Sequence, residues 1–525
     1  MRTNVRRASA AAVACLLVSA LGGCGTRVKR EEATAAPATS SPVATVHGES
    51  APGGAPGTPV ADGSDATGTP APAGTPSATA PVASGSAGSG QPPSGAAGAG
   101  TRAAGGPRSS AGMAPVPDRT TSGKGPNPQA TGSSGGSNNA GDAALPGQPA
   151  PATPGCPNPC APLVIGSVGT WSGLVGQNVV GGLHALQAWV AATNAAGGVN
   201  GHQVRLVTAD DGTDPARHRA LVQELVERRG VVAFVYNAAV FSGHASIGYL
   251  EERKIPVVGG SGTEPWYTTS PMFFTQVIAG EVAIEATVAS YARSAKAMGI
   301  AKMGLITCSD GVQVCQDTAR VAPGYIKRYG LELAYQGQAS LAQPDFTANC
   351  LAARNAGAEI LYLALDANSY SRFGKGCASV GYKPRYGIAQ PVMLADLAKD
   401  PNLQGSPGVS YTAPFFFGAN PGIARFQKAM GQYAAKAPLT GSASLGWSAA
   451  ELLGASARRL SPTPTSADVL EGVWSLNGDD LSGLTAPLRF KRGGPTVPPV
   501  CYWQVIVTNN SYQSPDQGQR HCERA

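Results

Sequence analysis

Eight of the ten cysteines follow residue 150, and they offer the clearest reactive chemistry in the chain. Thiols in such numbers either pair as disulfides or bind a metal ion. An even number in an exported chain favours disulfides, and pairing of nearest neighbours closes the shortest loops. Zinc is the alternative, because Cys156-Pro-Asn-Pro-Cys160 has a plausible ligand spacing, but no second Cys/His pair complements it. We predict no metal site, and disulfides between Cys156 and Cys160, Cys308 and Cys315, Cys350 and Cys377, and Cys501 and Cys522.

The sequence shows no arrangement of nucleophile, base and orienting group that would indicate catalysis. After residue 155 it contains no GxSxG, HExxH or CxxC motif and no GxxxxGK[ST] phosphate loop. His184, His202, His218 and His244 lack the spacing of metal ligands. We therefore predict that the protein is not an enzyme, with no catalytic residues and no cofactor.

The first 24 residues have the organisation of an export signal. Three arginines precede an apolar run, Ala8–Leu21, that is too short to span a bilayer comfortably. Leu21-Gly22-Gly23-Cys24 resembles the lipobox of bacterial lipoproteins, which are cut before a Cys that then receives a lipid. The alternative is an ordinary secretory signal followed by a chance Cys. No later stretch is apolar enough for a transmembrane helix, so we expect a signal peptide over 1–24 and an extracytoplasmic protein anchored to the cell membrane by a lipid on Cys24.

Residues 25–155 differ sharply in composition from the rest of the chain. Ala, Gly, Pro, Ser and Thr dominate and aromatic residues are absent, so this stretch cannot bury enough apolar surface to offset its chain entropy. We predict a disordered tether, and whether it is glycosylated stays open. The formal net charge of +7 includes basic residues of the signal and tether. No Lys/Arg stripe interleaved with aromatics is present, which argues against a nucleic-acid partner.

After the tether, apolar β-branched runs alternate with longer amphipathic segments. Leu163–Val168 and Val204–Val207 are predicted strands, and Gly181–Ala195 between them places apolar residues at helical spacing. Asp214-Pro215 is typical of a helix cap followed by proline at the first helical position. Strand, helix and strand at this spacing predict parallel sheets covered on both faces, with ligands bound at the carboxyl ends of the strands. Two such sets, near 162–278 and 280–410, predict two similar lobes.

Three motifs connect this part of the chain to a known family. They are NxxGGVNGxxV at Asn194–Val204, DDxTDP at Asp210–Pro215 and GSGTEP at Gly260–Pro265. In this order and spacing, residues 162–508 resemble the leucine/isoleucine/valine-binding protein family, the type I periplasmic binding proteins that serve ABC importers. The resemblance implies an α/β fold of two Rossmann-like lobes with parallel sheets, joined by a hinge of three crossings near 278–281, 408–412 and 484–490. It implies lobe 1 over 162–278 plus 412–484, lobe 2 over 280–410 plus 488–508, and a C-terminal tail over 509–525.

The resemblance also implies a function. It predicts a solute-binding lipoprotein that captures a small polar ligand, such as an amino acid, an amide or a small organic acid, in the cleft between the lobes. The partners would be the permease and ATPase subunits of an ABC transporter. The closed form would be selected because ligand contacts both lobes only in that state. Two alternatives stay open: a ligand-sensing receptor of the same fold without a transport role, and a structural envelope protein whose cleft is lost.

Residues expected to contact the ligand follow from the resemblance. Family members hold a ligand carboxylate with backbone N–H groups and hydroxyls at strand-end loops, and the matching positions are Ser261, Gly262 and Thr263. Helix capping is the alternative role of the two hydroxyls. Ala239-Val240 stands where relatives place a Ser, and Asn178 stands where they place a Tyr.

Gln390 is the main departure from the family pattern, because relatives place there the acidic residue that grips the ligand's ammonium group. A neutral amide supplies only a dipole, and an ammonium ion without a negative partner binds poorly. Either Asp366, at a family Tyr position, takes over this role, or the ligand is not an ordinary α-amino acid. The alternative role of Asp366 is to cap the helix that begins near Ser369. Trp266 would shield the ligand at the cleft edge, with ordinary packing as its alternative.

Overall fold

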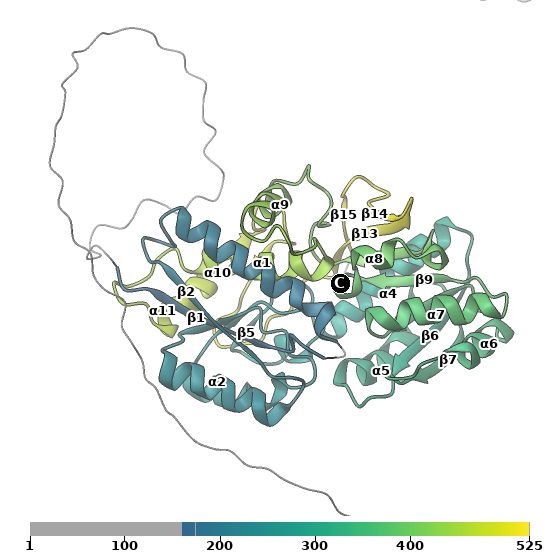
Figure 1. The fold of residues 1–525 in the computed structure, drawn as a ribbon, viewed down its shortest axis with the longest axis horizontal. Coiled ribbons are helices and arrows are strands. Elements are labelled where there is room, and N and C mark those ends of the chain that lie inside the picture. The colour runs from purple at the N-terminus through teal and green to yellow at the C-terminus, as the bar shows by residue number, and fades with distance from the viewer. Residues whose placement is uncertain (1–159, 174, 524–525) are drawn as a thin grey trace, which may run out of the picture. The chain divides into compact units, whose positions relative to one another are not determined.

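The computed structural model describes residues 160–173 and 175–523. The predicted signal peptide with Cys24, the predicted tether and Cys156 lie outside the described residues. The described chain forms two lobes, each built on a mainly parallel sheet with helices on its faces (Figure 1). The predicted α/β fold class with two parallel-sheet lobes is confirmed. Over the same residues, no helix combines the length and the apolar character needed to cross a membrane.

The first lobe contains a five-stranded parallel sheet in the order β2-β1-β3-β4-β5. Three helices that follow the second lobe in sequence return to the first, where α10 packs along α1 (Figure 1). The strands are β1 (Leu163–Gly169), β2 (Val204–Asp210), β3 (Ala233–Val235), β4 (Val257–Val258) and β5 (Phe273–Phe274). The helices are α1 (Gly176–Ala195), α2 (Pro215–Arg229), η1 (Gly243–Ser246), α3 (Ile247–Arg253), η2 (Pro265–Thr268), α9 (Pro421–Tyr433), α10 (Gly441–Ser456) and α11 (Ser466–Ser475).

The second lobe contains a larger sheet in the order β14-β13-β10-β9-β8-β6-β7, parallel from β10 to β7. Strand β13 pairs antiparallel with β10, β14 and β15, so the segment after residue 508 adds two short strands to this sheet. The strands are β6 (Lys302–Cys308), β7 (Glu332–Ala339), β8 (Ile360–Ala364), β9 (Arg385–Ala389), β10 (Pro407–Ser410), β13 (Cys501–Thr508), β14 (Ser511–Gln513) and β15 (Arg520–Cys522). The helices are α4 (Gly280–Ala297), α5 (Gln313–Arg328), α6 (Thr347–Asn355), α7 (Ala367–Ser379), η3 (Gln390–Val392), α8 (Ala395–Ala398) and η4 (Pro401–Leu403).

The chain passes between the lobes in three places. These are the segments after β5, after β10 and after the small antiparallel pair β11 (Asn477–Asp479) and β12 (Leu488–Arg489). Three connections constrain the lobes to a hinge-like motion about one line, which is the movement expected of a cleft that opens and closes.

Local sequence signals account for the elements that position the cleft. All seven residues of β1 are buried, as expected for a central strand of a parallel sheet with helices on both faces. Helix α2 begins as predicted: the Asp214 carboxylate accepts hydrogen bonds from the N–H groups of Ala216, at 2.8 Å, and Arg217, at 3.1 Å, and Pro215 occupies the first turn. The helix ends at Gly230, whose φ of 69° lies in the left-handed region that favours glycine.

Three of the four predicted disulfides lie within the described residues and are confirmed: Cys308–Cys315, Cys350–Cys377 and Cys501–Cys522. Cys160 is also disulfide-bonded. Cys308–Cys315 ties the end of β6 to the first turn of α5, beside the cleft. In residues 160–173 and 175–523 there is no cluster of three or more His, Cys, Asp or Glu side chains able to hold a metal ion.

Candidate functional site

A cavity of about 160 Å³ lies between the lobes and is lined by residues of both. It opens where parallel strands end. Thr170 follows β1, Ser261 follows β4, Cys308 ends β6 and Ala389 ends β9. This is the edge at which parallel α/β sheets bind ligands, because strand ends and helix N-termini leave backbone groups without partners there.

The cavity lining is mainly apolar. Side chains from several elements make up most of its wall, among them Val175, Val240, Phe241, Ile284, Val312 and Leu341. The Cys308–Cys315 disulfide also lines the wall, and Tyr362 and Tyr411 contribute aromatic rings. Among the described lining residues there is no Lys, Arg or His, and Asp366 alone carries an ionisable carboxyl group. A site of this composition binds an apolar body by excluding water from it.

The structure brings together six of the nine predicted ligand-contacting residues. Ser261, Gly262, Thr263, Asn178, Val240 and Asp366 line the cavity. Ala239, Trp266 and Gln390 are buried but are not among the lining residues. The neighbours of Ala239, Ala238 and Val240, do line it. Trp266 packs its ring beside His244, with the ring centroids 6.4 Å apart.

Gln390 lies at the junction between the lobes rather than in the cavity wall. Its amide nitrogen donates to Thr412 Oγ1 at 2.7 Å, to the Gly441 carbonyl at 3.1 Å and to Ser444 Oγ at 2.8 Å. Its amide oxygen accepts from the N–H groups of Tyr411 and Thr412. The side chain therefore joins η3 of the second lobe to α10 of the first and to the second crossing. A side chain whose donors and acceptors are all used in this way holds a hinge together.

Asp366 and Asn178 face one another across the cleft. Asp366 is the N-cap of α7, where its carboxylate accepts from the N–H of Asn368 at 3.1 Å and from the hydroxyl of Ser369. Asn178, on α1, accepts through its side-chain oxygen from the N–H of Ala367 at 3.3 Å. This hydrogen bond connects the two lobes directly. Asp366 has both the capping role foreseen for it and a place in the cavity wall.

The loop after β4 carries the two predicted hydroxyls and a third group that the sequence did not indicate. Ser261 Oγ and Thr263 Oγ1 lie 2.7 Å apart, and Ser261 Oγ donates to Glu264 Oε2 at 2.9 Å. Gly262 adopts a φ of 84°, and this left-handed conformation lets the loop fold tightly around the carboxyl group. Burial raises the pKa of the Glu264 carboxyl, and hydrogen bonds from Ser261, Thr263 and its own backbone N–H oppose this without cancelling it.

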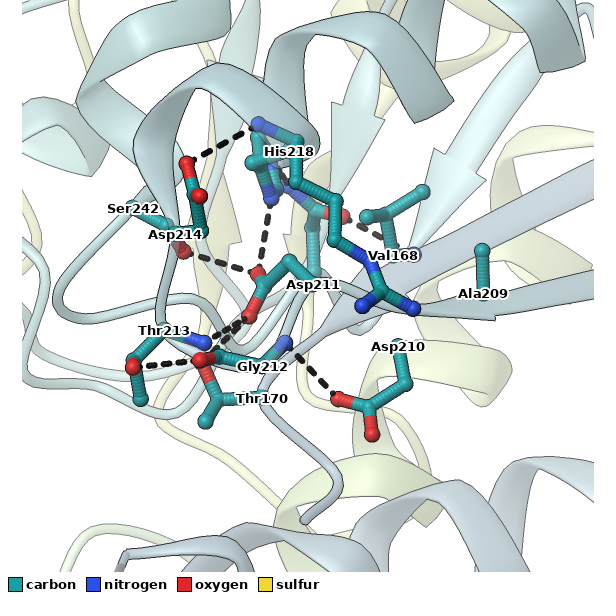
Figure 2. A network of polar contacts seen from close by, with 12 residues as sticks. Val168, Thr170, Ala209, Asp210, Asp211, Gly212, Thr213, Asp214, His218 and Ser242 are labelled. Atoms are coloured by element: carbon teal, nitrogen blue, oxygen red, sulfur yellow. Dashed lines mark hydrogen bonds and ion pairs between the residues drawn. The ribbon is translucent and has the colours of Figure 1, made fainter. Parts of the chain in front are cut away.

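A second buried carboxyl group, Asp211, lies within a network of polar contacts in the first lobe (Figure 2). Its Oδ1 accepts from the Thr170 hydroxyl at 2.8 Å, and its Oδ2 accepts from the Ser242 hydroxyl at 2.7 Å and lies 2.9 Å from His218 Nδ1. Burial raises the pKa of Asp211, but the hydrogen bonds from His218, Ser242, Thr213 and Thr170 outweigh it and hold the pKa below its ordinary value of 3.8. Since Thr170 lines the cavity, this network fixes part of the wall.

Sequence reasoning missed several residues of the site. Thr170 and Tyr411 line the cavity, and Glu264 and Asp211 lie directly behind it. The rule that ligands bind at strand ends applies to Thr170, one residue after β1. Thr170 could have been found by applying that rule to every predicted strand. Tyr411 lies in a crossing between lobes, for which no such rule exists.

Comparison with known proteins gives one family and many structural relatives. Residues 162–508 match a protein family described as periplasmic binding protein. No curated protein matches the sequence. A fatty acid ABC transporter substrate-binding protein from Thermomonospora curvata has a TM-score of 0.58 at 16% identity, over 68% of this chain and 92% of that chain.

Two further solved structures have the same architecture. A possible leucine/isoleucine/valine-binding protein from Rhodopirellula baltica SH 1 has a TM-score of 0.60 at 18% identity, over 69% of this chain and 98% of that chain. An ABC transporter solute binding protein from R. palustris in complex with benzoate has a TM-score of 0.56 at 15% identity, over 69% of this chain and 98% of that chain. At sequence identities this low, the structural similarity shows a shared fold and no more.

Proposed function

Because this chain belongs to the periplasmic binding protein family, we propose that it is the solute-binding lipoprotein of an ABC importer and that it captures a small, mainly apolar molecule between its lobes. The observation that carries the proposal is the cavity of about 160 Å³, which both lobes line at the carboxyl ends of their strands. An engineered apolar cavity of about 150 Å³ binds benzene, so this volume accommodates a body the size of one small ring or a short branched chain.

The chemistry of the cavity wall supports an apolar ligand. Valine, leucine, isoleucine and aromatic side chains from both lobes would be removed from water by such a body, at a gain of about 25 cal/mol per Å² of apolar surface. Structural relatives named for fatty acid and for benzoate show that apolar acids occur among the ligands of proteins with this fold. The small polar ligand expected from the family resemblance is therefore replaced in our proposal by a molecule whose body is apolar.

Closure would couple ligand capture to delivery. Asn178 on α1 and Ala367 on α7 form a hydrogen bond across the cleft, and Gln390 joins the lobes at the hinge. The contact between Asn178 and Ala367 forms only when the lobes approach, so a ligand that contacts both walls shifts the population toward the closed form. A permease that distinguishes closed from open protein would then receive loaded protein. The permease and ATPase are separate chains, and a lipid on Cys24 would keep the protein beside them.

Native mass spectrometry of the purified protein tests the proposal directly. We expect a co-purified small molecule, or binding of one in calorimetry with a panel of small apolar compounds, together with loss of its uptake when the gene is deleted. Binding with unchanged uptake would contradict the import role and favour a ligand-sensing receptor. Failure of every compound to bind, or chemical turnover of one, would contradict the solute-binding role itself.

A further inference from the structure

The loop after β4 encloses a carboxyl group of its own. Glu264 has no solvent exposure, and its Oε2 accepts from the Ser261 hydroxyl at 2.9 Å and from the Thr263 N–H at 3.2 Å. Backbone N–H groups of Ser261 and Glu264 also act on this carboxyl group. Successive N–H groups that converge in a tight loop form an anion-binding concavity. The Glu264 carboxyl group already fills the one made by this loop.

The two hydroxyls of the loop have no hydrogen left for a ligand. Ser261 Oγ donates its hydrogen to Glu264 Oε2. In the contact of 2.7 Å between Ser261 Oγ and Thr263 Oγ1, Thr263 must therefore be the donor. These are the positions at which family resemblance predicts a grip on a ligand carboxylate. Here both hydroxyls serve the carboxyl group of Glu264.

Other polar side chains in the lining are engaged in the same way. The hydroxyls of Thr287 and Thr318 donate to main-chain carbonyls of their own helices, at 2.7 Å each. Thr170 donates to Asp211, and the Tyr370 hydroxyl, with one hydrogen to donate, lies 2.7 Å from the Leu363 carbonyl oxygen and 2.8 Å from that of Gly387. Each of these hydroxyl hydrogens is satisfied within the protein, so a ligand carboxylate would find few side-chain donors to replace its lost water.

The charges around the cavity also oppose an anion. The described lining residues include no Lys, Arg or His, whereas the Asp366 carboxyl group lies in the wall, with Arg372 Nη2 outside the lining and 3.7 Å from its Oδ1. The donors that remain are the side-chain amide nitrogen of Asn178, whose oxygen alone is hydrogen-bonded among the described residues, and backbone N–H groups at the first turns of α4 and α5, which have no side-chain caps and begin at the cavity. Such groups bind an anion as well as an uncharged carbonyl oxygen, so the selection against a carboxylate rests on the filled loop after β4 and on the Asp366 carboxyl group.

We propose that Glu264 acts as a built-in substitute for the ligand carboxylate, and that the cleft therefore selects an uncharged, mainly apolar molecule with a carbonyl-type acceptor over the matching carboxylate. The inference rests on the proposed function and names the ligand class of that same cavity. Glu264 is a specificity-determining residue in this scheme, although it does not line the cavity.

Matched ligand pairs test the selection on the unmodified protein. Calorimetric affinities are measured at one neutral pH for benzamide against benzoate and for 4-methylpentanamide against 4-methylpentanoate. We expect the amide of each pair to bind at least about tenfold more tightly, the effect of a charged group left without partners. A carboxylate that binds as tightly as its amide would overturn the inference while leaving solute binding intact.

Two substitutions at Glu264 separate the proposed role from a general effect of the loop. Glu264→Ala empties the concavity, and we expect affinity for the carboxylates to rise at least about tenfold. Glu264→Gln keeps an acceptor oxygen in the concavity, so its gain should be smaller. Glu451→Ala, on α10 and away from the cavity, is a control for loss of a partly buried glutamate, here one paired with Arg425, and should leave the ligand preference unchanged.

The identity of any co-purified molecule gives an answer that needs no variant. An uncharged compound in the native mass spectrum supports the inference, and an ionised acid contradicts it. Absence of any bound molecule, together with failure of all four probes, contradicts the proposed function and the inference with it. No gain of carboxylate affinity in a folded Glu264→Ala protein, checked by circular dichroism, contradicts the inference alone.

Discussion

Two buried carboxyl groups stand behind the first-lobe wall of the cleft, and their surroundings differ. Asp211 uses both oxygens, which accept from Thr170, Ser242 and the Thr213 N–H and contact His218. Glu264 uses one oxygen, and its Oε1 has no hydrogen-bond partner among the described residues. The pKa of Asp211 is lowered and that of Glu264 is raised, although burial by itself raises the pKa of both groups.

This difference separates a structural carboxylate from one that shapes specificity. A fully hydrogen-bonded buried carboxylate organises the groups around it, so its loss leaves several donors without partners. A carboxyl group with one unpartnered oxygen contributes less to stability and persists where function requires it. The Asp211 network should therefore dominate stability, and Glu264 should dominate ligand preference.

Removal of the Asp211 carboxylate should have the largest effect on stability. Asp211→Ala leaves buried donors on Thr170, Ser242 and His218 without an acceptor, and we expect a loss of about 3–5 kcal/mol in the free energy of unfolding. Urea unfolding followed by circular dichroism measures it. The adjacent Asp210 is the control: its half-buried carboxylate accepts from the N–H groups of Trp171 and Gly212 and from the side chain of Ser172, near the surface, so Asp210→Ala should cost about 1 kcal/mol. Equal losses would contradict the structural role of Asp211.

The two carboxyl groups should also respond to pH in opposite directions. Because the pKa of Asp211 is lower in the folded state, its stabilisation is fully present above the unfolded value and is lost as the pH falls through the folded one. Because the pKa of Glu264 is raised, folding binds its proton, and this contribution is lost as the pH rises through the folded pKa.

Unfolding free energies measured between about pH 3 and pH 8 test these signs. Asp211→Ala should flatten the acid side of the wild-type curve, and Glu264→Gln should flatten the opposite side. A Glu264→Gln curve parallel to that of the wild type would show that Glu264 has an ordinary pKa.

The sequence predicted the fold well because its signals are local. The Asp214 cap, the buried run of β1 and the nearest-neighbour disulfides each depend on residues close together in the chain. The place of Ser261, Gly262 and Thr263 at the cavity followed from the resemblance to a known family. Side-chain direction at the strand ends did not follow, because the chain leaves the strand there and enters segments such as η3, where the alternation of a strand no longer applies. Thus Ala389 and Pro391 line the cavity while Gln390 turns into the hinge.

The hydrogen-bond partners of the two carboxyl groups depended on contacts that no local pattern encodes. Thr170 is 41 residues from Asp211, and Ser242 is 31 residues from it. Their meeting depends on how β1, β2 and the segment after β3 are arranged in space (Figure 2). The hydrogen-bond partners of Glu264 lie within three residues of it. Its side chain folds back into its own loop, and this depends on the left-handed backbone of Gly262.

A single hydroxyl in the Asp211 network should have an intermediate effect. Ser242→Ala removes one of the two groups at Asp211 Oδ2 and leaves His218 in place, so we expect a loss of about 1–2 kcal/mol. Thr170→Val removes the corresponding hydroxyl at Oδ1 and should cost a similar amount. Thr170 also lines the cavity, so only this variant should change ligand affinity measured by calorimetry. An equal change in ligand affinity in both variants would contradict this and would mean that the whole Asp211 network affects ligand binding.

Glu264→Gln should have the smallest effect on stability, within about 1 kcal/mol of the wild type at neutral pH. The amide oxygen can accept the hydrogen bonds that Oε2 now accepts, and the amide nitrogen takes the place of Oε1, which is already unpartnered. One unsatisfied group replaces another, while the cost of ionising a buried carboxyl group disappears. Urea unfolding at neutral pH measures the difference. A loss of unfolding free energy as large as that of Asp211→Ala would mean that Glu264, like Asp211, mainly stabilises the fold, and the contrast between the two carboxyl groups would disappear.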